Sequence, residues 1–104
     1  MALAALGVTP RTNANAAADA SAGQQTFESN CVVCHGKDGT GTAAGKSLKA
    51  PDLNSEAVQK LTDQQIADQI SNGKNNMPPF KSTLNNEQIK GLVAYVRSAF
   101  GKKH

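Results

Sequence analysis

The stretch Cys31-Val32-Val33-Cys34-His35 decides how the rest of this sequence is interpreted. Cysteines three positions apart lie on one face of a helical turn, because side chains at that spacing are neighbours on a helix. In a Cys-x-x-Cys-His pattern each thiol can bond to one vinyl group of haem, and the histidine then lies under the iron. The motif therefore predicts one covalently attached haem c on Cys31 and Cys34, with His35 as an axial iron ligand.

Other uses of this cysteine spacing lack their usual surroundings. A thioredoxin-like Cys-x-x-Cys motif is expected near a β-α-β pattern, and no stretch of this chain alternates apolar and polar residues long enough to suggest a sheet. A structural zinc site needs four ligands, and the chain holds only two cysteines and two histidines, with His104 at the terminus. A disulfide across so short a loop adds little stability. Haem attachment is the interpretation that these residues favour.

A second iron ligand is predicted at Met77, the only methionine besides Met1. It lies in the polar segment Asn75-Asn76-Met77-Pro78-Pro79-Phe80, where a core methionine is unexpected and the prolines stiffen the chain. A thioether is a soft ligand that favours Fe(II), so ligation by histidine and methionine raises the reduction potential.

The composition is that of one small domain with a thin core. The chain has 104 residues, 38% of them hydrophobic, with three Phe, one Tyr and no Trp. A chain this short often needs a metal or a cofactor to complete its core. The net charge of +3 favours acidic partners. The dispersed lysines come with no nucleic-acid-binding motif, and no stretch approaches the roughly 20 apolar residues of a membrane span.

The first 20 residues differ from the rest. A short apolar run from Met1 to Val8 is followed by an Ala-rich stretch that ends in Ala18-Asp19-Ala20, a pattern that signal peptidase cuts after. A basic segment ahead of the apolar run is missing. We interpret residues 1–20 as the remnant of a secretory leader or as a disordered tail, and residues 21–104 as the domain.

The remaining pattern predicts an all-α domain with three to five helices joined by irregular loops. Pairs in which Ser, Thr or Asn precedes Gln by three residues indicate capping boxes, and apolar residues follow at helical spacing. Glycines and a proline predict a loop over residues 36–52. The predicted helix starts are Ser21, Ser55, Thr62 and Asn85.

These residues together resemble the class I cytochromes c, over residues 21–101. The resemblance implies a fold wrapped around one covalently bound haem, with crossing N- and C-terminal helices. Gly23 and Phe27 would meet Leu92 and Tyr95 at this crossing, where a small residue lets the helices approach closely.

The resemblance also implies haem contacts outside the motif. Pro51 is similar to the family proline whose carbonyl accepts a hydrogen bond from the ligand histidine, which would raise the basicity of His35. Leu53 would pack on the haem face, and Met77 with Phe80 matches the axial methionine in a Met-Pro-x-Phe segment. The predicted cofactor-binding residues are thus Cys31, Cys34, Pro51, Leu53 and Phe80, with His35 and Met77 as iron ligands and no catalytic residues. The residues that meet the haem propionates stay open among Lys46, Lys49, Asn72, Asn75 and Asn76.

The function predicted is that of a soluble, monomeric one-electron carrier between redox protein complexes, not an enzyme. With both axial positions filled, substrate cannot reach the iron. Exposed lysines would steer a small, transient interface onto an acidic docking surface. Because haem is attached outside the cytoplasm, we expect the periplasm or the thylakoid lumen. The lysines from loops expected to rim the haem edge are Lys37, Lys46, Lys49, Lys74 and Lys81.

Three other functions stay open from the sequence. Displacement of Met77 would leave an open iron site, as in a peroxidase-like enzyme or a gas sensor. Cys31 and Cys34 could instead perform thiol–disulfide exchange without haem. A haem-bearing chain of this size could also be a subunit of a larger redox complex.

Overall fold

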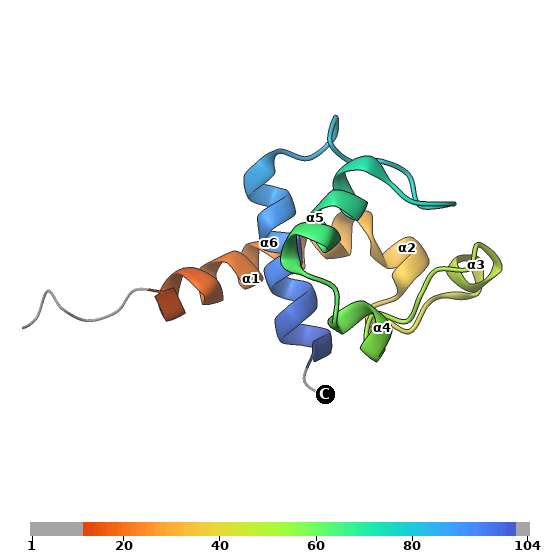
Figure 1. Cartoon of the computed structure of the whole chain (residues 1–104), viewed down its shortest axis with the longest axis horizontal. Coiled ribbons are helices and arrows are strands. Elements are labelled where there is room, and N and C mark those ends of the chain that lie inside the picture. Colours follow the sequence, from red (N-terminus) through yellow and green to blue (C-terminus); the bar gives the residue numbers. More distant parts are fainter. Residues whose placement is uncertain (1–11, 102–104) are drawn as a thin grey trace, which may run out of the picture.

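The computed structural model describes residues 12–101, which form helices joined by irregular loops (Figure 1). The predicted all-α class is confirmed, because the described residues contain no strand beyond an isolated bridge between Lys74 and Met77. No helix in this part of the chain is long and apolar enough to cross a membrane. The helices are α1 Thr12–Asn30, α2 Val32–His35, α3 Ala43–Ser47, α4 Glu56–Gln59, α5 Asp63–Asn72 and α6 Asn86–Phe100.

The N-terminal helix begins before the predicted capping residue. Ser21 lies inside α1, which already includes Thr12. The preceding segment is rich in alanine, which has the highest helix propensity, so it continues the helix toward the N-terminus. Most of the predicted leader, residues 1–11, lies outside the described residues, and residues 12–20 belong to α1.

The other predicted helix starts are confirmed by their hydrogen bonds. Ser55 caps α4 by accepting from the backbone N–H of Val58 at 3.3 Å. Thr62 and Gln65 form a complete capping box at the start of α5, with reciprocal bonds of 3.0 and 2.8 Å. Asn85 forms the same arrangement at the start of α6. These local bonds satisfy backbone donors that a helix leaves free at its N-terminus.

The helices α1 and α6 cross in close contact, as predicted (Figure 1). A Cβ atom on Gly23 would lie 1.9 Å from the carbonyl oxygen of Gly91, so neither backbone could keep its place. Phe27 is 2% exposed and packs its ring against Tyr95, with the centroids 5.3 Å apart. Leu92 is also fully buried. Gly91 is the partner of Gly23 that the sequence did not single out.

Gly23→Ala is expected to lower the free energy of unfolding by at least about 1–3 kcal/mol, as overpacking does. The direction of the change in stability is informative. At a helix position that contacts no other element, Gly→Ala would instead stabilise the protein by roughly 0.5–1 kcal/mol. Chemical denaturation of the haem-loaded protein would measure the change. Gln25→Ala, on an exposed part of α1, should leave stability nearly unaltered. A Gly23→Ala variant more stable than the parent would contradict the close crossing.

The predicted loop over residues 36–52 contains the short helix α3, which corrects that expectation. Thr42 caps α3 by accepting from Gly45 N–H at 3.0 Å, and its hydroxyl donates to the carbonyl of Val33 at 2.8 Å. Gly45 packs directly on Cys34, where a Cβ atom would lie 1.9 Å from the carbonyl oxygen. The segment is therefore fastened to the cysteine motif rather than loose.

Arg97 fastens α6 to the linker between α4 and α5. Its guanidinium donates to the carbonyl of Gln59 at 2.7 Å and to that of Leu61, and it pairs with the Asp63 carboxylate at 2.9 Å. The planar guanidinium can meet several acceptors at once, which a lysine cannot. These bonds fix the backbone of Leu61, a residue that lines a cavity of the domain.

Candidate functional site

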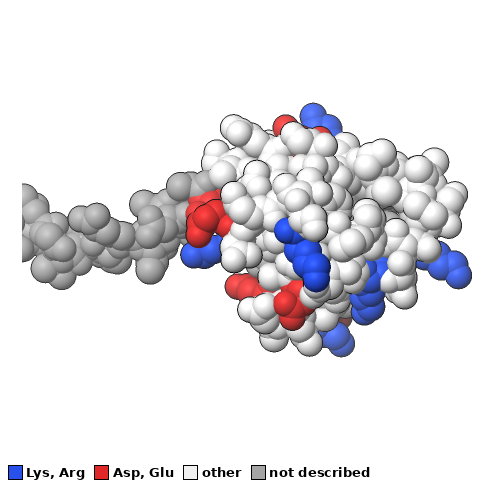
Figure 2. Space-filling view, turned by 90° about the horizontal axis from the view of Figure 1, so that it is seen from above, with Lys and Arg blue, Asp and Glu red and all other residues white. Residues whose placement is uncertain are grey.

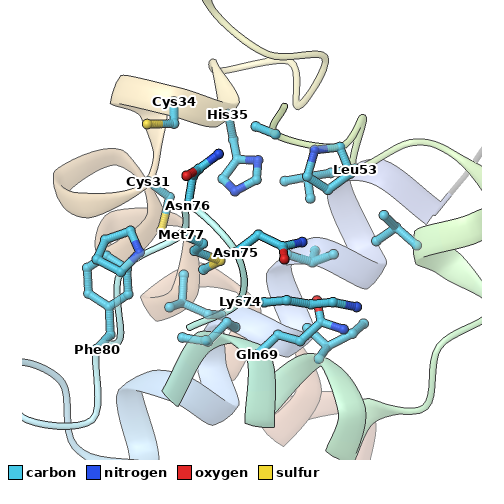
Figure 3. Close-up of a pocket in the computed structure, with 18 of the residues that line it drawn as sticks. Cys31, Cys34, His35, Leu53, Gln69, Lys74, Asn75, Asn76, Met77 and Phe80 are labelled. Carbon is cyan, nitrogen blue, oxygen red and sulfur yellow. The ribbon is translucent and has the colours of Figure 1, made fainter. Parts of the chain in front are cut away.

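A cavity of about 440 Å³ lies between α2, α5 and the segment from Lys74 to Phe80 (Figure 3). Its volume is within the range of cofactor sites, which are commonly 300–1,000 Å³ and mainly apolar. The walls include buried core residues such as Leu53, Ile70 and Leu92. The structure brings together every site residue predicted above along this lining: Cys31, Cys34, His35, Pro51, Leu53, Met77 and Phe80.

The cysteine motif forms one helical turn at the cavity wall. Backbone bonds from His35 N–H and Cys34 N–H to the carbonyl of Cys31, at 2.9 and 3.2 Å, fix this turn. The two cysteines form no disulfide. Burial, together with the charge of Cys34, raises the pKa of Cys31 to about 11. Thiol–disulfide exchange requires a thiolate, and its cysteines have lowered pKa values. The environment of Cys31 is therefore the opposite of the one that such an enzyme needs.

Burial of the His35 imidazole favours its neutral form. Burial lowers the pKa of His35, and the Pro51 carbonyl opposes this shift. Nδ1 is buried and has no partner of full hydrogen-bond geometry in the described part of the chain. Phe27 packs nearby, with its ring centroid 6.5 Å from that of His35. A neutral imidazole is the form that binds a metal.

Met77 is presented to the cavity by a tight turn. The backbones of Lys74 and Met77 exchange hydrogen bonds of 3.2 and 2.9 Å. Gly73 precedes the turn with φ +77°, and a Cβ atom there would lie 2.5 Å from the Met77 carbonyl oxygen. Phe80 N–H then bonds to the carbonyl of Ile70 at 3.0 Å, which anchors the segment to α5. Figure 3 shows the Met77 sulfur and the His35 ring pointing into the same space from different elements.

The polar part of the lining differs from the expectation in two respects. Of the residues considered for the propionates, Lys49, Asn75 and Asn76 line the cavity, whereas Lys46 and Asn72 are not part of its lining. Gln69 and Lys74 also line it, and neither was considered for this role. Gln69 follows Ile66 by three residues, so helical spacing could have placed it on the cavity face of α5.

These residues fit a haem. Two thiols lie on one wall, and the half-buried imidazole of His35, whose pKa is lowered by burial, faces the same cavity. A soft thioether enters from another element, and the remaining lining is largely apolar. Nitrogen and thioether donors are the axial ligands found in c-type haem proteins.

Comparison with known proteins bears on the same residues. Residues 18–96 match the family described as "Cytochrome C oxidase, cbb3-type, subunit III". Cytochrome c6 from Leptolyngbya boryana is 39% identical over 79 residues, covering 76% of this chain and 91% of the relative. The chain belongs to the class I cytochrome c family. A second relative is cytochrome c6 of Nostoc sp. strain PCC 7120. It is 41% identical to this chain over 80 residues, which cover 77% of this chain and 70% of the relative.

A solved structure agrees with this assignment. The "KustC0563 c-type cytochrome" superposes with a TM-score of 0.69 at 37% identity, covering 73% of this chain and 94% of that one. The predicted fold and family are thereby confirmed. As a class I cytochrome c, the chain carries covalently attached haem c with its iron, and it is an electron carrier rather than an enzyme. The roles of individual site residues stay predictions.

Proposed function

We propose that this cytochrome c is a soluble, exported one-electron carrier whose haem iron is ligated by His35 and Met77. The observation that carries the proposal is the cavity into which these two side chains project, with Cys31 and Cys34 on its wall (Figure 3). When bound, the haem supplies a reversible Fe(III)/Fe(II) couple. The protein then controls the potential, the access of water and the docking of partners.

Each residue has a distinct part in this proposal. Cys31 and Cys34 hold the haem through thioether bonds, so its position does not depend on the axial ligands. The Pro51 carbonyl, which acts on the imidazole of His35, would accept a hydrogen bond from Nδ1 and so orient the ring and increase its basicity. Leu53 and Phe80 pack on the haem and keep water away. The Met77 thioether, a soft donor, would favour the reduced iron, and His35 and Met77 together would leave no position on the iron for a substrate.

We further propose that the partners are redox complexes with acidic docking surfaces. All of the lysines predicted to rim the haem edge are exposed, and Lys49 and Lys74 line the cavity itself. In the view of Figure 2, the extreme end of the molecule on the α3 side shows basic side chains and no acidic ones. Such a surface accelerates encounter with an acidic partner at low salt.

The proposed setting is the periplasm or the thylakoid lumen, which fits the covalent haem. We retain the proposal that residues 1–20 derive from a leader or form a tail, with the domain over 21–104. Membership of a larger redox complex is the second candidate, because the matched family is described by the name of an oxidase subunit. The 91% coverage of a cytochrome c6 supports a free carrier instead.

Absorption spectra of the oxidised and reduced protein test this proposal. The protein would be exported in a host with haem-maturation machinery and also run on a denaturing gel stained for haem. We expect haem on the gel, low-spin bands in both states and the weak long-wavelength iron–sulfur band in the oxidised state. High-spin bands would contradict ligation by Met77 and move the function toward an open-site haem protein. Coelution with larger proteins in size-exclusion chromatography would favour the subunit alternative.

A further inference from the structure

A side-chain hydrogen bond joins the Met77 turn to the residue that follows α3. The Asn76 amide Nδ2 donates to the backbone carbonyl of Leu48 at 3.0 Å, across 28 positions of sequence. Leu48 is the C-cap residue that follows α3, and Asn76 sits at the tip of the turn whose ends are Lys74 and Met77. Both bonded residues line the cavity, so the hydrogen bond lies at its wall. Figure 3 shows Asn76 beside Met77 at this cavity.

The backbone on each side of this bond is unusual. Lys49 has φ +64° and Asn75 has φ +57°, and they are the non-glycine residues with positive φ in the described chain. Lys49 follows Leu48, and Asn75 precedes Asn76, so one left-handed residue adjoins each partner. Such residues persist where the surrounding structure holds them, and they are common at ligand clamps. The two turns thus aim the Leu48 carbonyl and the Asn76 amide at each other.

Little else fastens the tip of this turn. Asn75, Asn76 and Pro78 are exposed, and Met77 is half-buried. The turn is anchored at its base by Gly73 and by the bond from Phe80 to α5. Segments with few buried apolar contacts open locally at low free energy. A single hydrogen bond at the tip therefore makes up a large part of what resists opening.

We propose that Asn76 is a positioning residue that clasps the Met77 turn to the end of α3 and so keeps the Met77 sulfur on the iron. The inference rests on the proposed ligation by Met77 and adds the element that sets how readily this ligand leaves. Loss of the Asn76 hydrogen bond should therefore increase the rate at which the Met77 sulfur leaves the iron, and should lower the free energy of global unfolding much less. The reduction potential is affected little, because the ligands stay the same.

Imidazole binding to the ferric, haem-loaded protein tests the clasp, because imidazole reaches the iron only after Met77 has left. Asn76→Ala should increase the binding rate roughly fivefold, the factor that corresponds to one hydrogen bond of about 1 kcal/mol. Asn76→Asp keeps the shape of the side chain but cannot donate, so it should also bind imidazole faster. The midpoint of global denaturation should change little in both variants.

Asn72→Ala is the matched control. Asn72 is an exposed asparagine at the end of α5, just before the same turn and outside the cavity lining. Its imidazole rate should equal that of the parent. Equal rates for Asn76→Ala and Asn72→Ala, in a parent with the low-spin iron–sulfur spectrum, would overturn the clasp and leave ligation by Met77 intact. A parent without that spectrum would overturn the proposed ligation and the clasp together.

Discussion

Met77→Ala is expected to lower the reduction potential by on the order of 100 mV, a part of the roughly 0.8 V range that axial ligation spans among haem proteins. The soft thioether stabilises Fe(II) relative to Fe(III), so its removal favours the oxidised state. The ferric spectrum should change from low spin to high spin, and the iron–sulfur band should disappear. Potentiometric titration followed by absorption measures both changes in the same sample.

Two further variants make the Met77 result specific. Met77→His restores a sixth ligand, so its spectrum should return to low spin while its potential stays below that of the parent. Lys81→Ala changes an exposed residue just beyond the Met77 segment and should leave the spectrum unaltered. If Met77→Ala kept the parent's potential and spectrum, Met77 would not be an axial ligand, and an open site or another ligand would have to replace it.

Replacing both Cys31 and Cys34 with Ser is expected to abolish covalent haem and to leave a poorly folded chain. Without the cofactor, a cavity of about 440 Å³ would be left in the domain, and core residues that line it, such as Leu53, Ile70 and Leu92, would lose the group they pack against. We expect a loss on the order of 5 kcal/mol, which is comparable to the whole stability of many small domains. Far-ultraviolet circular dichroism would show the loss of helix, and a haem-stained denaturing gel would show the loss of covalent attachment.

Val33→Ser is the control for this experiment, since Val33 lies between the two cysteines and is 70% exposed. It introduces the same residue into the same turn and should retain haem and fold. A double cysteine variant that stays helical, cooperative in unfolding and colourless would show that haem is not needed to complete the core.

The chemistry of this protein could be predicted from its sequence because it resides in short segments. Cys31, Cys34 and His35 lie within one helical turn, so their spacing alone determines that they share a face. The capping boxes at Thr62 and Asn85 are equally local, since each bond joins residues three apart. At Ser21 the same pattern was misleading, because the alanine-rich segment before it is itself helical.

Tertiary structure decided which distant groups meet, because such contacts depend on how the helices pack and not on spacing along the chain. Three such contacts join residues far apart in sequence. They are the approach of Gly23 to Gly91, the hydrogen bond from Arg97 to Gln59 before α5, and the hydrogen bond from Asn76 to Leu48. The short helix α3 likewise depends on contacts with the cysteine turn that no local pattern records. The sequence by itself determined what kind of site this chain builds, and the packing of α1, α5 and α6 decided which polar residues border it.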